Sequence, residues 1–198
     1  GRRRQSSPAV WAGSDLDPAH WTITLSAEHR DEIAHTARSV VRDGITLDGL
    51  DRDSFPLPGL AAEIAAWTRH LAYGSGFVLL RGFPVDELTP TEVEVAYLGL
   101  GTHLGTPVGQ NKAGDVLTHI RDERLTEAAG VRLYRTNQRQ DFHTDGADLI
   151  GLLCLNRSLR GGESRIVSAG ALYNEILDRR PDLLEVLYQP FTWDRQGE

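Results

Sequence analysis

The sequence has little of what marks several protein classes. It contains no methionine and a single cysteine, so an internal disulfide is excluded. Its 198 residues carry a net charge of -7, which argues against a nucleic-acid surface because such a surface needs a concentrated basic face. No apolar run approaches the roughly 18 residues of a membrane span, and no apolar core of a signal peptide follows Arg2 to Arg4. We therefore predict a cytoplasmic protein that binds neither nucleic acid nor membrane.

What remains fits one globular domain with a sizeable core, since 40% of the residues are hydrophobic and 25% are charged. Residues 1–20 are polar and predict an extended N-terminal arm, with Trp11 and Trp21 as anchors to the body. Residues 21–198 form the predicted domain. Apolar residues at helical spacing predict helices at 26–42, 59–73, 89–100, 169–180 and 181–188. Alternating or continuous apolar runs predict strands at 77–80, 116–120, 131–136, 150–155 and 164–167.

The segment from Asp141 to Gly146 carries the chemistry. In an extended chain His143 and Asp145, at i and i+2, point to the same side, so an imidazole and a carboxylate converge on one point. Two histidines and one carboxylate on one face suit non-haem Fe(II) that must also bind a cosubstrate and O2. The alternative interpretation is a Thr-Asp-Gly turn with a surface histidine.

The order of elements around this pair resembles the TauD/TfdA family of Fe(II)/2-oxoglutarate-dependent dioxygenases. The pair is followed by an apolar run and then by Gly161-Gly162-Glu163-Ser164, where the family has Gly-Gly-[Asp/Glu]-Thr before a helix. Upstream, the resemblance includes residues 76–83 and 104–107, so that it covers roughly residues 60 to 193. It implies a mainly β fold with flanking helices, a double-stranded β-helix or jelly roll of the clavaminate synthase-like kind, in which residues 150–155 form a central buried strand.

The resemblance also implies a site and a reaction. His143 and Asp145 would bind Fe(II), and the Ser164 hydroxyl would contact 2-oxoglutarate, with serine in place of the commoner threonine. A small-molecule substrate would be oxidised by O2, with hydroxylation as the commonest outcome and release of succinate and CO2. We expect polar residues near the mouth of the site to line the substrate pocket, namely Gln110, Asn111 and Gln140.

Two parts that the family uses have no counterpart in the sequence. The second metal histidine and the arginine that pairs with 2-oxoglutarate come from late strands, and no histidine follows His143. We expect that the domain is incomplete at its C-terminus, and the missing methionine favours a partial chain; the alternative is a catalytically incomplete jelly-roll binding domain. His119 is the fallback third ligand.

A hydrolase is the competing enzyme class, with Ser164 or Cys154 as nucleophile and His143 as base. No Gly-x-Ser-x-Gly elbow accompanies either nucleophile. Cys154 lies in the apolar run, where we expect a buried and inert thiol.

Overall fold

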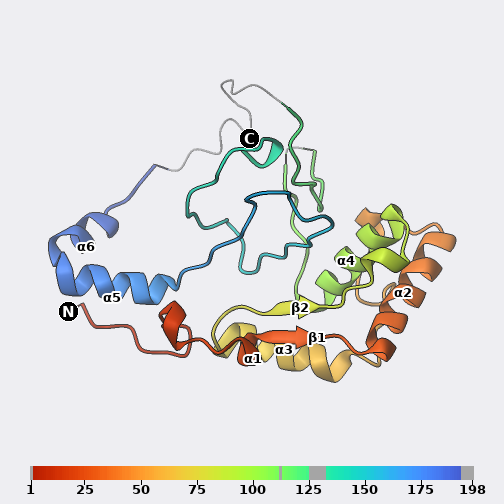
Figure 1. Cartoon of the computed structure of the whole chain (residues 1–198), viewed down its shortest axis with the longest axis horizontal. Helices are drawn as coiled ribbons and strands as arrows, with labels where there is room; N and C mark the ends of the chain where they lie inside the picture. Colours follow the sequence, from red (N-terminus) through yellow and green to blue (C-terminus); the bar gives the residue numbers. More distant parts are fainter. Residues whose placement is uncertain (1, 112, 125–132, 193–198) are drawn as a thin grey trace. The chain divides into compact units, whose positions relative to one another are not determined.

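The structure is a computed structural model that describes residues 2–111, 113–124 and 133–192. Contacts divide the chain into two compact units, and the division falls within one helix. Of the described residues, the first unit holds 2–33, 57–84 and 165–192, and the second holds the remainder. Figure 1 shows the elements of both units, coloured along the sequence from red at the N-terminus to blue at the C-terminus.

The first unit is built around a two-stranded parallel sheet of β1 (Thr22–Thr24) and β2 (Leu79–Arg81), in which Ile23 pairs with Leu80. Trp11 and Trp21 both pack on Phe77, with ring centroids 5.4 and 5.3 Å away, so the predicted aromatic anchors are confirmed. The helices of this unit are η1 (Gly13–Asp15), α1 (Pro18–Trp21), the start of α2 (Ala27–Arg42), α3 (Ala61–Tyr73), α5 (Ala169–Arg179) and α6 (Pro181–Leu187).

Side chains of α5 and its cap bind the main chain of Gln5 and Ala9 in the N-terminal segment. The buried Asn174 amide accepts a hydrogen bond from the Gln5 N–H at 2.8 Å and donates one to the Gln5 carbonyl at 2.9 Å. The Ser168 hydroxyl, also buried, donates to the Ala9 carbonyl at 2.6 Å while it caps α5. Because these bonds satisfy buried polar atoms on both sides, they fix the N-terminal residues on the helix. The boundary of the arm at residue 20 stays a prediction.

The second unit is organised around α4 (Pro90–Leu104). Thr89 and Glu92 form a capping box at its start, and Pro90 occupies the first helical position. At its end, His103 Nε2 donates to the Phe55 carbonyl at 2.7 Å, while Arg52 donates to Nδ1. The other elements are η2 (Leu47–Gly49), η3 (Val85–Glu87) and η4 (Leu133–Arg135), and the buried α4 side chains are Val93, Val95, Ala96, Leu98 and Leu100.

All five predicted helices are present within a few residues of their expected bounds. No helix in the described part of the chain is long and apolar enough to span a membrane.

The predicted mainly β jelly roll is wrong. Across the described residues the only sheet has two strands of three residues each, and the other elements are helical. Of the predicted strands, 77–80 overlaps β2; 133–135 is the short helix η4, and residues 131 and 132 lie outside the described residues. Residues 116–120, 150–155 and 164–167 have neither helix nor strand.

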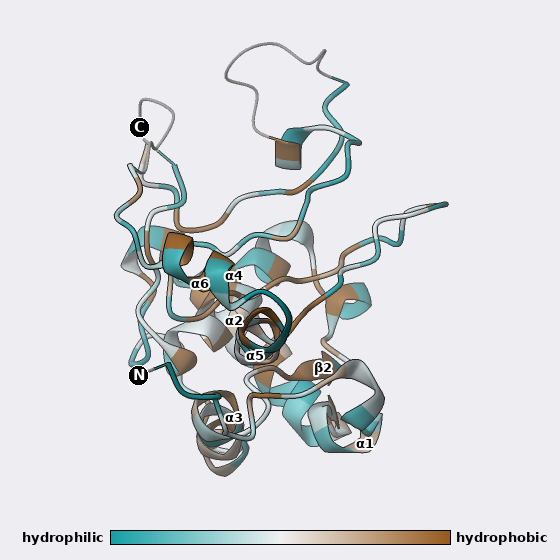
Figure 2. Ribbon diagram, turned by 90° about the vertical axis from the view of Figure 1, so that its left-hand side faces the viewer, coloured by the Kyte–Doolittle hydropathy of each residue, from teal (hydrophilic) through white to brown (hydrophobic). Residues whose placement is uncertain are grey.

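The clearest difference from the prediction is at residues 150–155, where a central buried strand was expected. Ile150 is 49% exposed and Leu152 is 66% exposed. Hydrophobic residues, brown in Figure 2, recur along the chain that lies outside helices and strands. A helix satisfies its hydrogen bonds internally, whereas a strand needs a partner, and no ladder partner for this run lies among the described residues.

Candidate metal centre

His143 and Asp145 lie together in the second unit. The distance between His143 Nε2 and Asp145 Oδ1 is 3.8 Å, and each side chain is about half exposed. The other ring nitrogen, Nδ1, is 2.7 Å from the Asp141 carbonyl oxygen. The expected convergence of imidazole and carboxylate is therefore present in a segment that has no regular secondary structure.

The Asp141 contact determines which ring nitrogen is free. A carbonyl oxygen can only accept, so Nδ1 carries the proton and donates it. In the neutral ring Nε2 then has an unprotonated lone pair, on the side of Asp145. Histidines that bind metals commonly hold their second N–H in this way, because it fixes both tautomer and ring orientation.

The spacing of the two donor atoms is close to what one metal ion requires. Bonds of about 2.0–2.2 Å at a right angle place two donor atoms about 3 Å apart. The observed 3.8 Å would need to shorten by less than about 1 Å, which two half-exposed side chains can do by small rotations. The two donor atoms, an imidazole nitrogen and a carboxylate oxygen, are of the types that bind transition metals, and they lie on the same side of the segment.

The third ligand is not found among the described residues, where no group of three or more His, Cys, Asp or Glu side chains could hold a metal ion. His119, the fallback candidate, places Nε2 3.0 Å from Glu94 Oε1 on α4. Its nearest acidic partner is therefore a helix residue, and it does not join His143 and Asp145 in such a group.

Ser164 follows a turn that requires its glycines. Gly161 and Gly162 have φ of 71° and 77°, a region that side chains other than glycine rarely adopt, and Ser158 Oγ donates to the Gly161 carbonyl. Ser164 itself is exposed. Its contact with 2-oxoglutarate stays a prediction.

The predicted substrate residues lie in loops. The Gln110 side chain donates to the Val108 carbonyl at 2.9 Å, and Asn111 Nδ2 donates to Asp115 Oδ2 at 2.7 Å. Both amides thus bond within their own loop, and Gln140 is exposed. Their contact with a substrate stays a prediction.

The burial expected at Cys154 is wrong, because the residue is exposed and its thiol donates to the Asn156 carbonyl at 3.5 Å. The cause is the same as for the missing strand, since most of the apolar run is exposed. That the thiol is inert stays a prediction. Among the contacts of those residues His143 pairs with Asp141 and Asp145, and not with Ser164 or Cys154. The serine or cysteine hydrolase therefore receives no geometric support.

One feature of the site was missed from the sequence. The Asp141 carbonyl orients His143, but every residue has a main-chain carbonyl, so the residue type at position 141 does not indicate this contact. The signal that was available is spacing, because a residue two positions before a histidine is within reach of its Nδ1.

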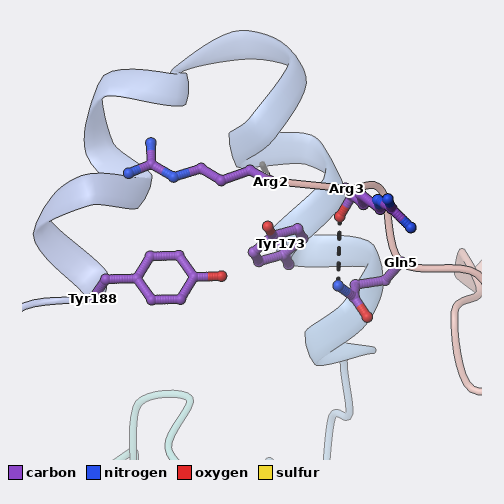
Figure 3. A pocket seen from close by; sticks show the side chains of 5 residues that line it. All are labelled: Arg2, Arg3, Gln5, Tyr173 and Tyr188. Carbon is purple, nitrogen blue, oxygen red and sulfur yellow. Dashed lines mark hydrogen bonds between the residues drawn. The ribbon is translucent and has the colours of Figure 1, made fainter.

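A cleft of about 580 Å³ lies in the first unit and contains none of the predicted site residues. Figure 3 shows Arg2 passing above Tyr188, whose hydroxyl points toward Tyr173, and hydrogen bonding with Tyr188 raises the pKa of Tyr173. Arg2 already donates to Glu185 at 3.0 Å and to the Pro181 carbonyl at 3.2 Å. Its charge is therefore matched within the chain. The cleft is lined by Arg2, Arg3, Gln5, Tyr173 and Tyr188.

Comparison with known proteins adds independent information. The family model described as "Taurine catabolism dioxygenase TauD, TfdA family" matches residues 43–198. The chain is 35% identical over 193 residues to FR-33289 synthase of Streptomyces rubellomurinus, and 27% identical over 220 residues to the taurine hydroxylase-like protein SAT17 of Stachybotrys chartarum. These alignments cover 96% and 94% of the chain but 57% of each relative, so the chain spans little more than half the length of the proteins it matches.

Proposed function

The chain belongs to the TauD/TfdA family of dioxygenases, and from that membership we propose that it is part of a non-haem Fe(II)- and 2-oxoglutarate-dependent dioxygenase that oxidises a small molecule. Members of this family in general depend on Fe(II) and 2-oxoglutarate. The names of the two relatives, a synthase and a hydroxylase-like protein, support an enzyme and favour hydroxylation as the outcome. The location in the cytoplasm stays a prediction.

The observation that carries the proposal is the geometry of His143. Its Nδ1–H is held by the Asp141 carbonyl, and its Nε2 is directed to the side where Asp145 Oδ1 lies 3.8 Å away. We propose that these two side chains are two of three protein ligands. When bound, Fe(II) supplies the coordination positions at which 2-oxoglutarate and O2 react, with release of succinate and CO2.

The remaining proposed roles belong to residues of the same unit. We assign to Ser164 a hydrogen bond from its hydroxyl group to a carboxylate of 2-oxoglutarate, which the exposed position after the Gly161-Gly162 turn permits. Gln110, Asn111 and Gln140 are assigned to the substrate. The intraloop bonds of Gln110 and Asn111 each use one amide N–H, which leaves a second N–H on each side chain for a ligand.

A second candidate function is a catalytically incomplete binding domain. The observation that favours it is that the described residues supply two metal ligands and no third. The two candidates differ in turnover, because a binding domain holds a ligand without consuming 2-oxoglutarate.

The test uses the full-length protein, in which iron content and succinate release are measured together. His143→Ala and Asp145→Ala should each abolish both, since each leaves an open site with one ligand fewer. Matched controls are His35→Ala and Asp48→Ala, exposed residues of α2 and η2. Ser164→Ala should keep iron and raise the half-saturating 2-oxoglutarate concentration about ten- to a hundredfold, the loss of one hydrogen bond to a charged group.

The outcomes separate the candidates. Wild-type protein that binds 2-oxoglutarate but releases no succinate indicates the binding domain. Succinate release by His143→Ala at the rate of His35→Ala would refute the proposed metal site.

A further inference from the structure

One face of α4 receives two of the segments that follow this helix in the second unit. Glu94 contacts His119 at 3.0 Å, and Tyr97 contacts Gly151. Residues three positions apart are neighbours on a helix surface, so Glu94 and Tyr97 lie on the same face. The segments around residues 119 and 151 therefore attach side by side to the best-packed element of this unit.

The contact at Gly151 depends on the absence of a side chain. A Cβ atom at this position would lie 2.7 Å from the Tyr97 Oη and 3.5 Å from Cζ. Gly151 is not among the glycines with positive φ, so space rather than backbone conformation requires glycine here. Tyr97 is half-buried, and burial raises the pKa of its hydroxyl. The phenol is thus held against the chain and is not a freely moving surface group.

The segment that carries His143 and Asp145 has no regular secondary structure to hold it, so its contact with α4 at Gly151 restricts its position. No helix or sheet ladder orders residues 142–155, in which both proposed iron ligands lie. Helix α4 is well ordered by comparison, since Val93, Ala96 and Leu100 on it are buried. A fixed point six residues after Asp145 restricts the conformations of the ligand segment, and a site whose ligands are held before binding loses less entropy when the metal binds.

We propose that Tyr97 is a positioning residue for the iron site, which holds the segment of His143 and Asp145 on α4 through its contact with Gly151. The inference rests on the proposed function, because it takes these two residues as ligands. Tyr97 acts through the chain and touches neither the metal nor the substrate.

The test measures binding of Co(II), as a spectroscopic substitute for Fe(II), to the full-length protein by titration without turnover. Tyr97→Ala removes the ring and should weaken binding about tenfold, the usual scale for loss of a residue that supports a metal ligand. Tyr97→Phe keeps the ring and should stay within about twofold of wild type, because a phenyl group retains most of the contact. Thermal unfolding of each variant shows whether the fold is kept.

A second pair of variants does not depend on the stability of Tyr97→Ala. Gly151→Ala should weaken Co(II) binding about fivefold, since its Cβ displaces the Tyr97 hydroxyl or the chain. In the double variant Gly151→Ala/Tyr97→Phe the nearest ring atom is Cζ at 3.5 Å, an ordinary contact, and affinity should return to that of wild type. The control is Gly105→Ala, where an added Cβ meets nothing within 4 Å.

The results distinguish the two proposals. If Gly151→Ala binds Co(II) as tightly as Gly105→Ala, or if the double variant fails to recover, the positioning role is wrong while the metal site stands. If wild-type protein binds no Co(II), the proposed function fails and the positioning role fails with it.

Discussion

Gly99 and Gly101 lie two residues apart on α4, and the same substitution at each should change stability in opposite directions. A Cβ at Gly99 would lie 2.4 to 2.6 Å from three atoms of the Phe55 ring. Phe55 is fully buried, so its ring cannot move into solvent. A Cβ at Gly101 would meet nothing within 4 Å.

The expected magnitudes follow from two opposing effects. Alanine in place of glycine favours a helix by up to about 1 kcal/mol. Overpacking of a filled core costs about 1–3 kcal/mol, and the short distances at Gly99 indicate the upper end. Gly99→Ala should therefore lower the free energy of unfolding by about 2 kcal/mol, whereas Gly101→Ala should raise it by up to about 1 kcal/mol.

Urea unfolding followed by circular dichroism is the assay. With a slope of about 2 kcal/mol per molar urea, Gly99→Ala should lower the midpoint by about 1 M, and Gly101→Ala should raise it by up to about 0.5 M. Equal or higher stability of Gly99→Ala would refute the packing of Phe55 against α4. An unchanged slope in both variants would show that the surface exposed on unfolding is the same as in wild type, so that the shift in midpoint reports a change in stability.

Two further predictions concern polar contacts. The Glu92 carboxylate accepts a hydrogen bond from the Thr89 N–H at 2.8 Å, and this bond lowers the pKa of Glu92 below its ordinary value of 4.5. The stabilisation from this bond is complete above the ordinary pKa and is lost as the pH falls through the lowered pKa. In this pH range the free energy of unfolding of Glu92→Gln should therefore change less with pH than that of wild type. A slope equal to that of wild type would contradict the capping role. Asn174→Ala removes both hydrogen bonds to Gln5, and it should lower the free energy of protection of the Gln5 amide against hydrogen exchange by about 1–3 kcal/mol. Protection equal to that of wild type would show that another group holds this amide.

The helices could be predicted because their determinants are local. Thr89 and Pro90 start α4, and Gly74 ends α3, and each acts on hydrogen bonds inside its own helix. The convergence of His143 and Asp145 was equally local, since it depends on residues two positions apart. Their role as metal ligands stays a prediction.

The strands could not be predicted in the same way. The apolar run at 150–155 has the composition of a buried strand, but burial and a ladder depend on segments far away in the sequence. The exposed Ile150 shows this, because its burial would be decided by partner segments that residue periodicity does not identify.

The bonds between Gln5 and Asn174 join residues 169 positions apart, and this separation has a consequence for biosynthesis. At about 5–20 residues per second, a ribosome needs roughly 10 to 30 seconds to synthesise α5 after residues 2–10. During this interval the early segment has no Asn174 to bind, and its main-chain groups are open to chaperones or proteases. The packing of residues 2–10 on α5 is therefore completed only after this helix has been synthesised.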